Sequence, residues 1–310
     1  MNPGVWVTFR LPPELDALRA APYALHLGEG RAPDLPADAR NAVRAIVTNG
    51  IRGAERALIE YFPRLELIAS LGIGLDALDL GCARERHVRV TNTPGVIADD
   101  VADLAMAMII DRLRGVRDAN AFVLRGDWLK GPYPLARSLT GCRLGIVGLG
   151  AIGSAIAARA AAFHMQVAWH GPRAKPGVNL PRFDDLEALA RASDVLVVSC
   201  AGGAATRHMV NARILQALGP EGVLVNVARG SVVDTAALVV ALESGSLAGA
   251  ALDVFESQPR IPDELLRSEK VLLTPHLGTA TRETRARMGR MVLASLAEHF
   301  AGRDPAYRVD

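Results

Sequence analysis

A glycine-rich turn of the dinucleotide-binding spacing lies at Gly148-Leu149-Gly150-Ala151-Ile152-Gly153, between an apolar run and a helix-like run. In such a turn the first glycine permits a tight bend and the second lets a pyrophosphate approach the backbone. The third lets the helix pack closely on the strand. A helix that begins near Ala151 presents unpaired backbone N–H groups to phosphates. Glycine turns also occur without nucleotides, so the prediction of a dinucleotide site depends on the strand before the turn and the helix after it.

The residues after the next apolar run indicate which nucleotide is preferred. A site for NAD usually places Asp or Glu about twenty residues beyond the glycines, on the ribose 2′-hydroxyl. Here that window reads Trp169-His170-Gly171-Pro172-Arg173-Ala174-Lys175, and the first carboxylate is Asp184. A solvated basic loop is the less specific interpretation. Because the acid is absent and Arg173 and Lys175 can pair with a 2′-phosphate, we predict a preference for NADPH over NADH.

Three later segments carry polar side chains directly after apolar runs. They read Asn226-Val227-Ala228-Arg229-Gly230, Asp253-Val254-Phe255-Glu256-Ser257-Gln258-Pro259 and Thr274-Pro275-His276-Leu277-Gly278. If each run is a strand, each segment lies at the carboxyl edge of a sheet, where open α/β folds bind their ligands. Arg229 offers a fork of donors for carboxylate and carbonyl oxygens, and His276 belongs to the residue type that titrates near neutral pH.

Both side chains have a less specific interpretation. An arginine after a strand is more often a surface or structural residue, and a histidine there is usually not catalytic. The other histidines, His87, His164 and His208 among them, lack a comparable context, and we expect them to be packing or surface residues. The segments that surround Arg229 and His276 favour the catalytic interpretation for these two.

The elements that must position these residues alternate along the chain between short apolar runs and helical patterns. In the first hundred residues the expected strands are 5–9, 45–48, 67–70 and 88–91, with helices over 36–42 and 53–62. A long packed helix is expected over 99–110, because carboxylates open it and apolar residues follow. This alternation predicts a parallel sheet with crossover helices.

A second series of strands and helices begins at Leu144. Continuous apolarity typical of strands covered on both faces is found at 144–148, 166–169, 195–199, 223–227, 248–254 and 272–276. Helical stretches at 154–163, 186–192, 212–217 and 235–244 separate these strands. The sequence therefore predicts an α/β protein with two Rossmann-like, open parallel-sheet domains.

Taken together, the motifs resemble those of the D-isomer-specific 2-hydroxyacid dehydrogenases. The matches are SLGIGLDALD, PGVIADDVADLA, the GLGAIG turn, NVARGSVVD, ALDVFESQP and TPHLGTAT, in the family's order from about residue 67 to 281. The resemblance implies a discontinuous substrate domain, residues 1–96 and 279–310, and a dinucleotide-binding domain over 97–278. It places the active site in the cleft between them, closing by hinge motion. It also implies a homodimer to which the region 99–125 contributes, with Trp128 and Tyr133 as candidates to reach a partner's site.

The resemblance implies hydride transfer between NADPH and a small 2-oxo acid, of the glyoxylate, hydroxypyruvate or 2-ketogluconate type, to give a D-2-hydroxy acid. A 2-oxo acid needs its carboxylate held, its carbonyl polarised and its oxygen protonated as hydride arrives. Arg229 and His276 suit these roles, and the family's glycine-rich loop Leu71-Gly72-Ile73-Gly74 turns backbone N–H groups toward the substrate carboxylate. Further cofactor contacts are implied for Thr206, Val227, Ala228, Arg229, Asp253, His276 and Gly278.

Gln258 departs from the family pattern. The family normally has Glu immediately before this proline, paired with the histidine; glutamine can hold the imidazole by a hydrogen bond but supplies no charge. Formate dehydrogenases of the same family also carry Gln there, but the VADLA helix and the short N-terminal half are more similar to glyoxylate/hydroxypyruvate reductases. Glu256, two residues earlier, is a second carboxylate that could take the position sterically. We expect Gln258 to affect rate and pH range rather than reaction class.

A second function stays open, a non-enzymatic dinucleotide sensor, because transcriptional corepressors share this fold. Gln258 favours it, whereas Arg229 and His276 favour the enzyme.

The composition is that of a globular protein, with 50% hydrophobic and 22% charged residues and a net charge of +2, too small to indicate nucleic acid or membrane partners. Cys82, Cys142 and Cys200 form no metal or disulfide pattern and suit a reducing cytoplasm. The N-terminal stretch lacks a signal-peptide pattern, and the apolar segment 144–169 divides better into strand, helix and strand than into a membrane span.

Overall fold

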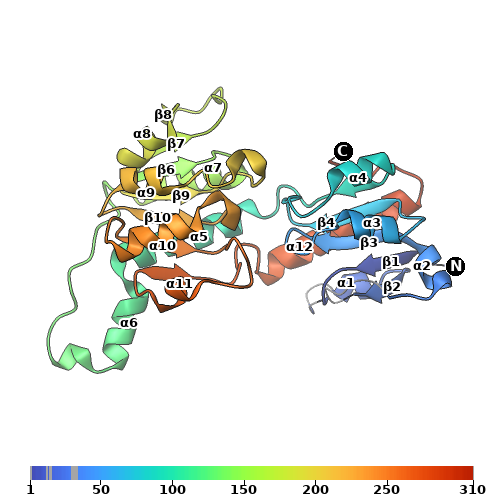
Figure 1. The fold of residues 1–310 in the computed structure, drawn as a ribbon, viewed down its shortest axis with the longest axis horizontal. Coiled ribbons are helices and arrows are strands. Elements are labelled where there is room, and N and C mark those ends of the chain that lie inside the picture. Colours follow the sequence, from blue (N-terminus) through green and yellow to red (C-terminus); the bar gives the residue numbers. More distant parts are fainter. Residues whose placement is uncertain (1, 12, 14–15, 29–33, 310) are drawn as a thin grey trace. The chain divides into compact units, whose positions relative to one another are not determined.

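The structure, a computed structural model, describes residues 2–11, 13, 16–28 and 34–309. The chain divides into two compact units, which we call the first unit (residues 1–97 and 280–310) and the second unit (residues 98–279). Each unit has its own parallel sheet with helices packed against it (Figure 1).

The first unit is built on a five-stranded sheet in the order β2-β1-β3-β4-β5. Strands β1 and β4 are buried along their whole length, because helices cover both faces of the sheet. The strands are β1 (Gly4–Val7), β2 (Ala24–Leu27), β3 (Val43–Asn49), β4 (Leu67–Leu71) and β5 (Arg89–Thr91). The helices are α1 (Asp16–Arg19), α2 (Ala37–Ala42), α3 (Arg56–Tyr61), α4 (Leu80–Glu85) and α12 (Arg282–Phe300).

The second unit contains a seven-stranded sheet in the order β12-β11-β10-β9-β6-β7-β8. Its strands are β6 (Arg143–Val147), β7 (Gln166–His170), β8 (Arg182–Phe183), β9 (Val195–Val198), β10 (Val223–Asn226), β11 (Gly249–Leu252) and β12 (Val271–Leu273). Its α-helices are α5 (Ala98–Arg114), α6 (Val116–Leu124), α7 (Ala151–Ala162), α8 (Leu186–Arg191), α9 (Ala212–Leu218), α10 (Thr235–Glu243) and α11 (Asp263–Arg267). Short 3-10 turns are η2 (Asp127–Leu129), η3 (Ala204–Thr206) and η4 (Gly230–Val232).

The strand register aligns the carboxyl ends of five neighbouring strands in the second unit. Val147 of β6 pairs with Val198 of β9, which in turn pairs with Asn226 of β10. Asn226 pairs with Leu252 of β11, and Leu252 with Leu273 of β12. Because each of these residues is the last of its strand, the segments that follow all leave the sheet at one edge. The strand order also reverses at β6, which makes this edge the ligand-binding side of an open α/β sheet.

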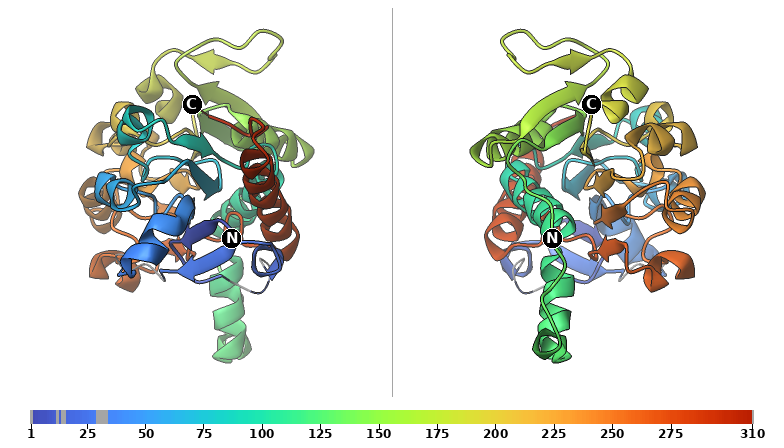
Figure 2. Two further views of the ribbon diagram at one scale, coloured as in Figure 1. Left: turned by 90° about the vertical axis from the view of Figure 1, so that its right-hand side faces the viewer. Right: turned by 90° about the vertical axis from the view of Figure 1, so that its left-hand side faces the viewer.

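The prediction of two parallel-sheet α/β units is confirmed, but the helices α1, α4, α6, α11 and α12 were not predicted, and some predicted elements differ at their ends. Helix α7 begins at Ala151 rather than 154, directly on the glycine turn, and β1 ends at Val7 rather than 9. Strands β2 and β8 also escaped prediction; they are only four and two residues long, and none of their residues is fully buried. Helix α6, which has no buried residue, projects from the second unit, as does the loop between β7 and β8 (Figure 2).

The apolar segment 144–169 forms β6, α7 and β7. Across the described part of the chain, no helix is both long enough and apolar enough to cross a membrane.

Candidate active site

The glycine turn after β6 is shaped by one positive φ and by close contacts at two of its glycines. Gly148 has a φ of +93°, which favours glycine, and a Cβ there would lie 2.6 Å from the backbone of Cys200. A Cβ on Gly153 would lie 2.2 Å from the carbonyl oxygen of Gly148, so helix and strand approach too closely for any side chain. Around Gly150, by contrast, a Cβ would meet none of the described atoms within 4 Å. The turn thus leaves open space beside the first N–H groups of α7, which suits a bound phosphate.

The loop after β7 is held against this turn by basic side chains. Lys175 donates a hydrogen bond from its ammonium group to the carbonyl oxygen of Leu149, inside the glycine turn. Arg182 donates to the carbonyl oxygen of Gly171 at 2.9 Å, and its guanidinium carbon lies 5.7 Å from the centre of the Trp169 ring. Lys175 therefore contacts the glycine turn itself, and Arg182 holds the loop through a contact that was not predicted from the sequence.

Arg173 lies between these two anchors with an exposed side chain. The nearest carboxylate in sequence, Asp184, is ion-paired with Arg182. His170 uses Nδ1 for a contact of 3.0 Å with the carbonyl oxygen of Phe183. The loop after β7 thus carries an exposed arginine, and the first carboxylate beyond it, after β8, is already paired.

The segment after β10 is shaped by the buried side chain of Asn226. Its Oδ1 accepts from the N–H of Ala228 at 3.0 Å, and its Nδ2 donates to the carbonyl oxygen of Arg229 at 3.0 Å. The Arg229 guanidinium donates to the carbonyl oxygen of Ala228 at 2.7 Å. Gly230 then packs so tightly that a Cβ would lie 1.9 Å from the carbonyl carbon of Phe255. Arg229 is therefore carried on a backbone turn with little freedom, while Val227 and Ala228 are buried beneath it.

Asp253 holds the turn that carries His276. Its side chain is 1% exposed, and its carboxylate accepts from the N–H of Leu277 at 2.7 Å and from the N–H of Gly278 at 3.0 Å. The hydroxyl of Thr274 donates to the same carboxylate at 2.7 Å. His276 itself has a φ of +57° and donates its N–H to the carbonyl oxygen of Asp253 at 3.0 Å. Asp253, through its hydrogen bonds to Leu277 and Gly278, therefore fixes the turn that positions His276.

Gln258 lies against the imidazole of His276. Its Nε2 is 3.3 Å from Nδ1 of the histidine, and its Oε1 accepts from the N–H of Phe255 at 3.5 Å. The amide thus contacts the imidazole through Nδ1. The alternative that Glu256 takes the place of the missing carboxylate is wrong, because its carboxylate binds His208 and Arg207 instead.

The remaining predicted residues fall in two places. Thr206 ends the turn η3 after β9, where its hydroxyl donates to the carbonyl oxygen of Ala201 at 2.9 Å. The loop 71–74 belongs to the first unit: Gly72, with a φ of +113°, donates its N–H to the hydroxyl of Thr93 at 2.9 Å, and Ile73 accepts from Asn92. The register of the second unit thus brings together the glycine turn, Arg229, Gln258 and His276 at one sheet edge.

Known proteins are similar to this chain in sequence and in structure. A model of the D-isomer specific 2-hydroxyacid dehydrogenase NAD-binding domain matches residues 106–278. The chain is 44% identical over 264 residues to a glyoxylate/hydroxypyruvate reductase of Arabidopsis thaliana, covering 85% of this chain and 84% of that protein. It is 41% identical to a 2-ketogluconate reductase of Gluconobacter oxydans, covering 84% of each.

Solved structures give the same similarity over the whole chain. An NADPH-dependent glyoxylate/hydroxypyruvate reductase of Sinorhizobium meliloti, in complex with NADP and malonate, superposes with a TM-score of 0.92 at 37% identity. The superposition covers 100% of this chain and 97% of that one. A 2-hydroxyacid dehydrogenase of Ketogulonicigenium vulgare has the same TM-score at 40% identity, covering 100% and 99%.

Proposed function

Because the chain belongs to the D-isomer-specific 2-hydroxyacid dehydrogenase family, we propose that it uses NADPH to reduce a small 2-oxo acid to the D-2-hydroxy acid. The substrates we propose are of the glyoxylate, hydroxypyruvate or 2-ketogluconate type. The observation that carries the proposal is the register of β6, β10, β11 and β12, which puts a dinucleotide turn, an arginine and a histidine at one edge of one sheet.

Arg229 and His276 supply what the reaction needs from the protein. The guanidinium of Arg229 holds the substrate carboxylate and polarises the carbonyl oxygen, and its fixed turn limits the entropy lost on binding. His276 holds a proton on Nε2 and donates it to the carbonyl oxygen as that oxygen gains negative charge. The nicotinamide, when bound, supplies the hydride. We assign the N–H groups of the loop 71–74 in the first unit to the substrate carboxylate as well.

We assign the dinucleotide to the second unit and the 2′-phosphate to the loop after β7. Gly148, Gly150 and Gly153 leave room for the pyrophosphate at the start of α7. Arg173 is exposed at the position where the ribose 2′-substituent is recognised in this fold, and Lys175 stands beside the glycine turn. The NADPH dependence of the Sinorhizobium meliloti relative supports the same preference here.

We further propose that the protein is a homodimer whose subunits meet along the projecting arm, residues 116–135. Helix α6 has no buried residue, yet the arm carries six large apolar side chains that are more than half exposed. They are Val116, Val123, Leu124, Trp128, Leu129 and Leu135. Six exposed apolar side chains on one arm are unusual for a monomer. A second copy of the same arm would offer an apolar surface to cover them.

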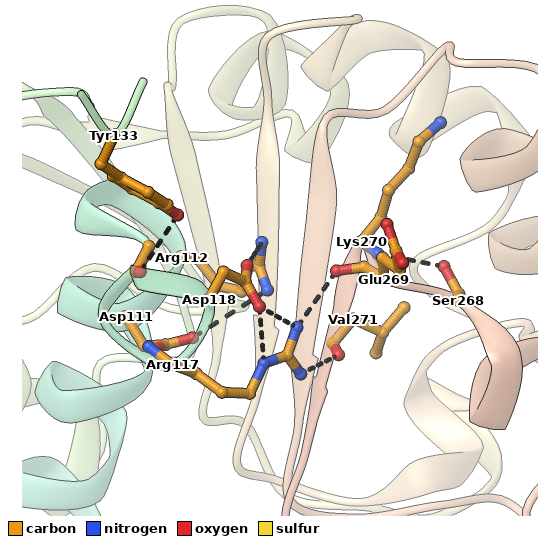
Figure 3. Close-up of polar contacts among 10 residues, drawn as sticks. Asp111, Arg112, Arg117, Asp118, Tyr133, Ser268, Glu269, Lys270 and Val271 are labelled. Carbon is orange, nitrogen blue, oxygen red and sulfur yellow. Dashed lines mark hydrogen bonds and ion pairs between the residues drawn. The ribbon is translucent and has the colours of Figure 1, made fainter. Parts of the chain in front are cut away.

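The base of the arm is held to the rest of the second unit by hydrogen bonds. Figure 3 shows Arg117 reaching from α6 to the backbone at the start of β12, where it donates to the carbonyl oxygens of Val271 at 2.7 Å and Glu269 at 3.1 Å. Its own N–H donates to Asp111 at 2.7 Å. The hydroxyl of Tyr133 donates to the carbonyl oxygen of Gly115 at 3.4 Å, so the returning segment of the arm is anchored too.

The experiment that tests the function is NADPH oxidation against a panel of 2-oxo acids, with NADH run in parallel. We expect turnover with at least one small 2-oxo acid and a D-configured product by chiral analysis. Arg229→Ala should abolish turnover while leaving NADPH affinity nearly unchanged. A wild-type protein that binds NADPH but turns over no member of the panel would overturn the proposal and favour a dinucleotide sensor. The relatives from Arabidopsis thaliana, Gluconobacter oxydans and Sinorhizobium meliloti are all named as reductases, which gives the sensor no support.

A further inference from the structure

The carboxylate of Glu256 binds three side chains, and no sequence pattern around Glu256 indicates these contacts. Its Oε1 accepts from Nε2 of His208 at 2.7 Å and from the guanidinium of Arg207 at 3.0 Å. Its Oε2 accepts from the hydroxyl of Thr235 at 3.2 Å. Asp234 lies on the far side of the same imidazole, 3.9 Å from Nδ1 of His208. The carboxylate therefore joins residues that are 21 to 49 positions away in sequence.

These contacts link the loops that leave three neighbouring strands. Arg207 and His208 follow β9 and come directly after Thr206, Thr235 begins α10 after β10, and Glu256 follows β11. Two of the loops also touch through their backbones, since His208 donates its N–H to the carbonyl oxygen of Ser231 at 2.8 Å. Glu256 is thus the side chain that ties the loop after β9 to the segments that bear Arg229 and Gln258.

The loop after β9 is also paired with the segment after β10 further along the chain, because Val210 donates its N–H to the carbonyl oxygen of Val232 at 3.0 Å and accepts from the N–H of Asp234 at 3.0 Å. A cavity of about 530 Å³ lies beside this cluster, against Gly230, Thr235 and Glu256, and its lining comes from the segments after β10 and β11. His208 also occupies left-handed backbone, with a φ of +49°, a conformation that an L-residue keeps only when its surroundings hold it. The backbone hydrogen bond to Ser231 and the contact of its imidazole with Glu256 supply that support.

The carboxylate is ionised in this setting. Burial by itself raises the pKa of Glu256, but the hydrogen bond from His208, the hydrogen bond from Thr235 and the charge of Arg207 together hold the pKa below its ordinary value. A charged acceptor makes stronger hydrogen bonds than a neutral one, so replacing the carboxylate by an amide weakens every contact in the cluster.

We propose that Glu256 is a positioning residue for the cofactor, which fixes the loop 203–209 through Arg207 and His208 relative to the segments of Arg229 and Gln258. This inference rests on the proposed assignment of the dinucleotide to this sheet edge, with Thr206 in the loop that contacts it. Losing the carboxylate should weaken cofactor binding, while recognition of the 2-oxo acid, which Arg229 carries, stays nearly unchanged.

The test compares Glu256→Gln with a matched control, Glu264→Gln. Glu264 lines the same cavity but belongs to α11, outside the three loops. NADPH dissociation constants are measured by titration, and KM and kcat are measured for the cofactor and for the best 2-oxo acid. We expect Glu256→Gln to raise the dissociation constant and the KM for NADPH by about tenfold, the factor that corresponds to roughly 1.4 kcal/mol. The KM for the 2-oxo acid should change less than about twofold, and Glu264→Gln should change neither.

A second variant keeps the proposal testable if Glu256→Gln folds poorly. His208→Asn tolerates left-handed backbone but is too short to keep the contact with Glu256. If Glu256 acts through His208, the double variant should bind NADPH no more weakly than the weaker single variant. Unchanged NADPH affinity in both single variants, additive losses in the double variant, or an equal loss in Glu264→Gln would each overturn the proposal. Because the titration needs no turnover, its outcome is separate from that of the substrate panel.

Discussion

Gln258→Glu puts a negative charge beside the imidazole that has to give up a proton in the reductive direction. The glutamine Nε2 is 3.3 Å from Nδ1 of His276, so a carboxylate oxygen in the same place lies at ion-pair distance. Its second oxygen can keep the contact with the N–H of Phe255 that now orients the amide. The change therefore adds charge with little change in shape.

The size of the effect follows from the distance and the exposure of the pair. At 4 Å two unit charges interact by about 1 kcal/mol in water and about 4 kcal/mol at an effective dielectric constant of 20. Gln258 and His276 are both half-buried, which places the interaction between these limits before the cost of partly desolvating the new carboxylate is subtracted. A net preference of roughly 1.4 kcal/mol for the imidazolium moves its titration by about one pH unit.

The assay is kcat for reduction between about pH 5.5 and 9.5, with saturating NADPH and the best 2-oxo acid, so that the profile reports the bound enzyme. We expect the alkaline limb of the Gln258→Glu profile to lie about one unit above that of the wild type. Gln258→Met, similar in size but uncharged, should not move the limb upward. An alkaline limb that stays in place in a folded Gln258→Glu variant with normal NADPH affinity would refute the reasoning, because the contact with His276 could not then govern the proton.

Three further predictions concern the cofactor, the arm and the first unit. Arg173→Ala should raise the KM for NADPH by about tenfold and leave that for NADH unchanged in steady-state kinetics; equal changes would show that Arg173 does not read the 2′-phosphate. Leu124→Asp should shift sedimentation equilibrium toward the monomer, whereas Val240→Asp, at an exposed apolar site of α10 outside the arm, should not; a dimer that persists in Leu124→Asp contradicts the arm as interface. Burial lowers the pKa of His299 below its ordinary 6.5 more than the contact with Glu66 raises it, so stability present above pH 6.5 is lost as the pH falls. His299→Gln should therefore flatten the decline in the free energy of unfolding between about pH 7 and 5, as measured by urea titration, and parallel slopes would count against it.

The helices and strands that carry the site could be predicted from the sequence because their signals are local. Continuous apolar runs indicated β6, β9, β10 and β11, and the glycine spacing indicated the turn before α7. Gly148 has a positive φ, and Gly153 has a close backbone contact that leaves no room for a side chain. Because both conditions favour glycine, the residue type itself indicates the turn. The contact between Gln258 and His276 also followed from the family motif rather than from any long-range reasoning.

Elements without such a local signal escaped prediction. Helix α6 buries none of its residues, so its apolar positions do not mark a core-facing stripe. Strand β8 is two residues long and exists because it pairs with Trp169 and His170 of β7, a partner supplied by the fold. The anchor of the arm joins Arg117 to Val271, 154 positions apart, and no pattern in either neighbourhood points to the other.

The residue types, the strand-turn-helix units and the chemistry available at their ends were therefore determined by the sequence itself, since backbone preferences and burial periodicity act over a few residues. Which side chains meet was decided only by the tertiary structure. Glu256 lies two residues before Gln258, yet it binds His208 and not His276, because the order β9-β10-β11 brings the loop after β9 to its carboxylate. The carboxylate of Asp253 likewise accepts hydrogen bonds from the turn that carries His276, because β11 and β12 end in register. A hydrogen bond forms between groups that the strand order places within about 3 Å, and strand order is a property of the whole sheet.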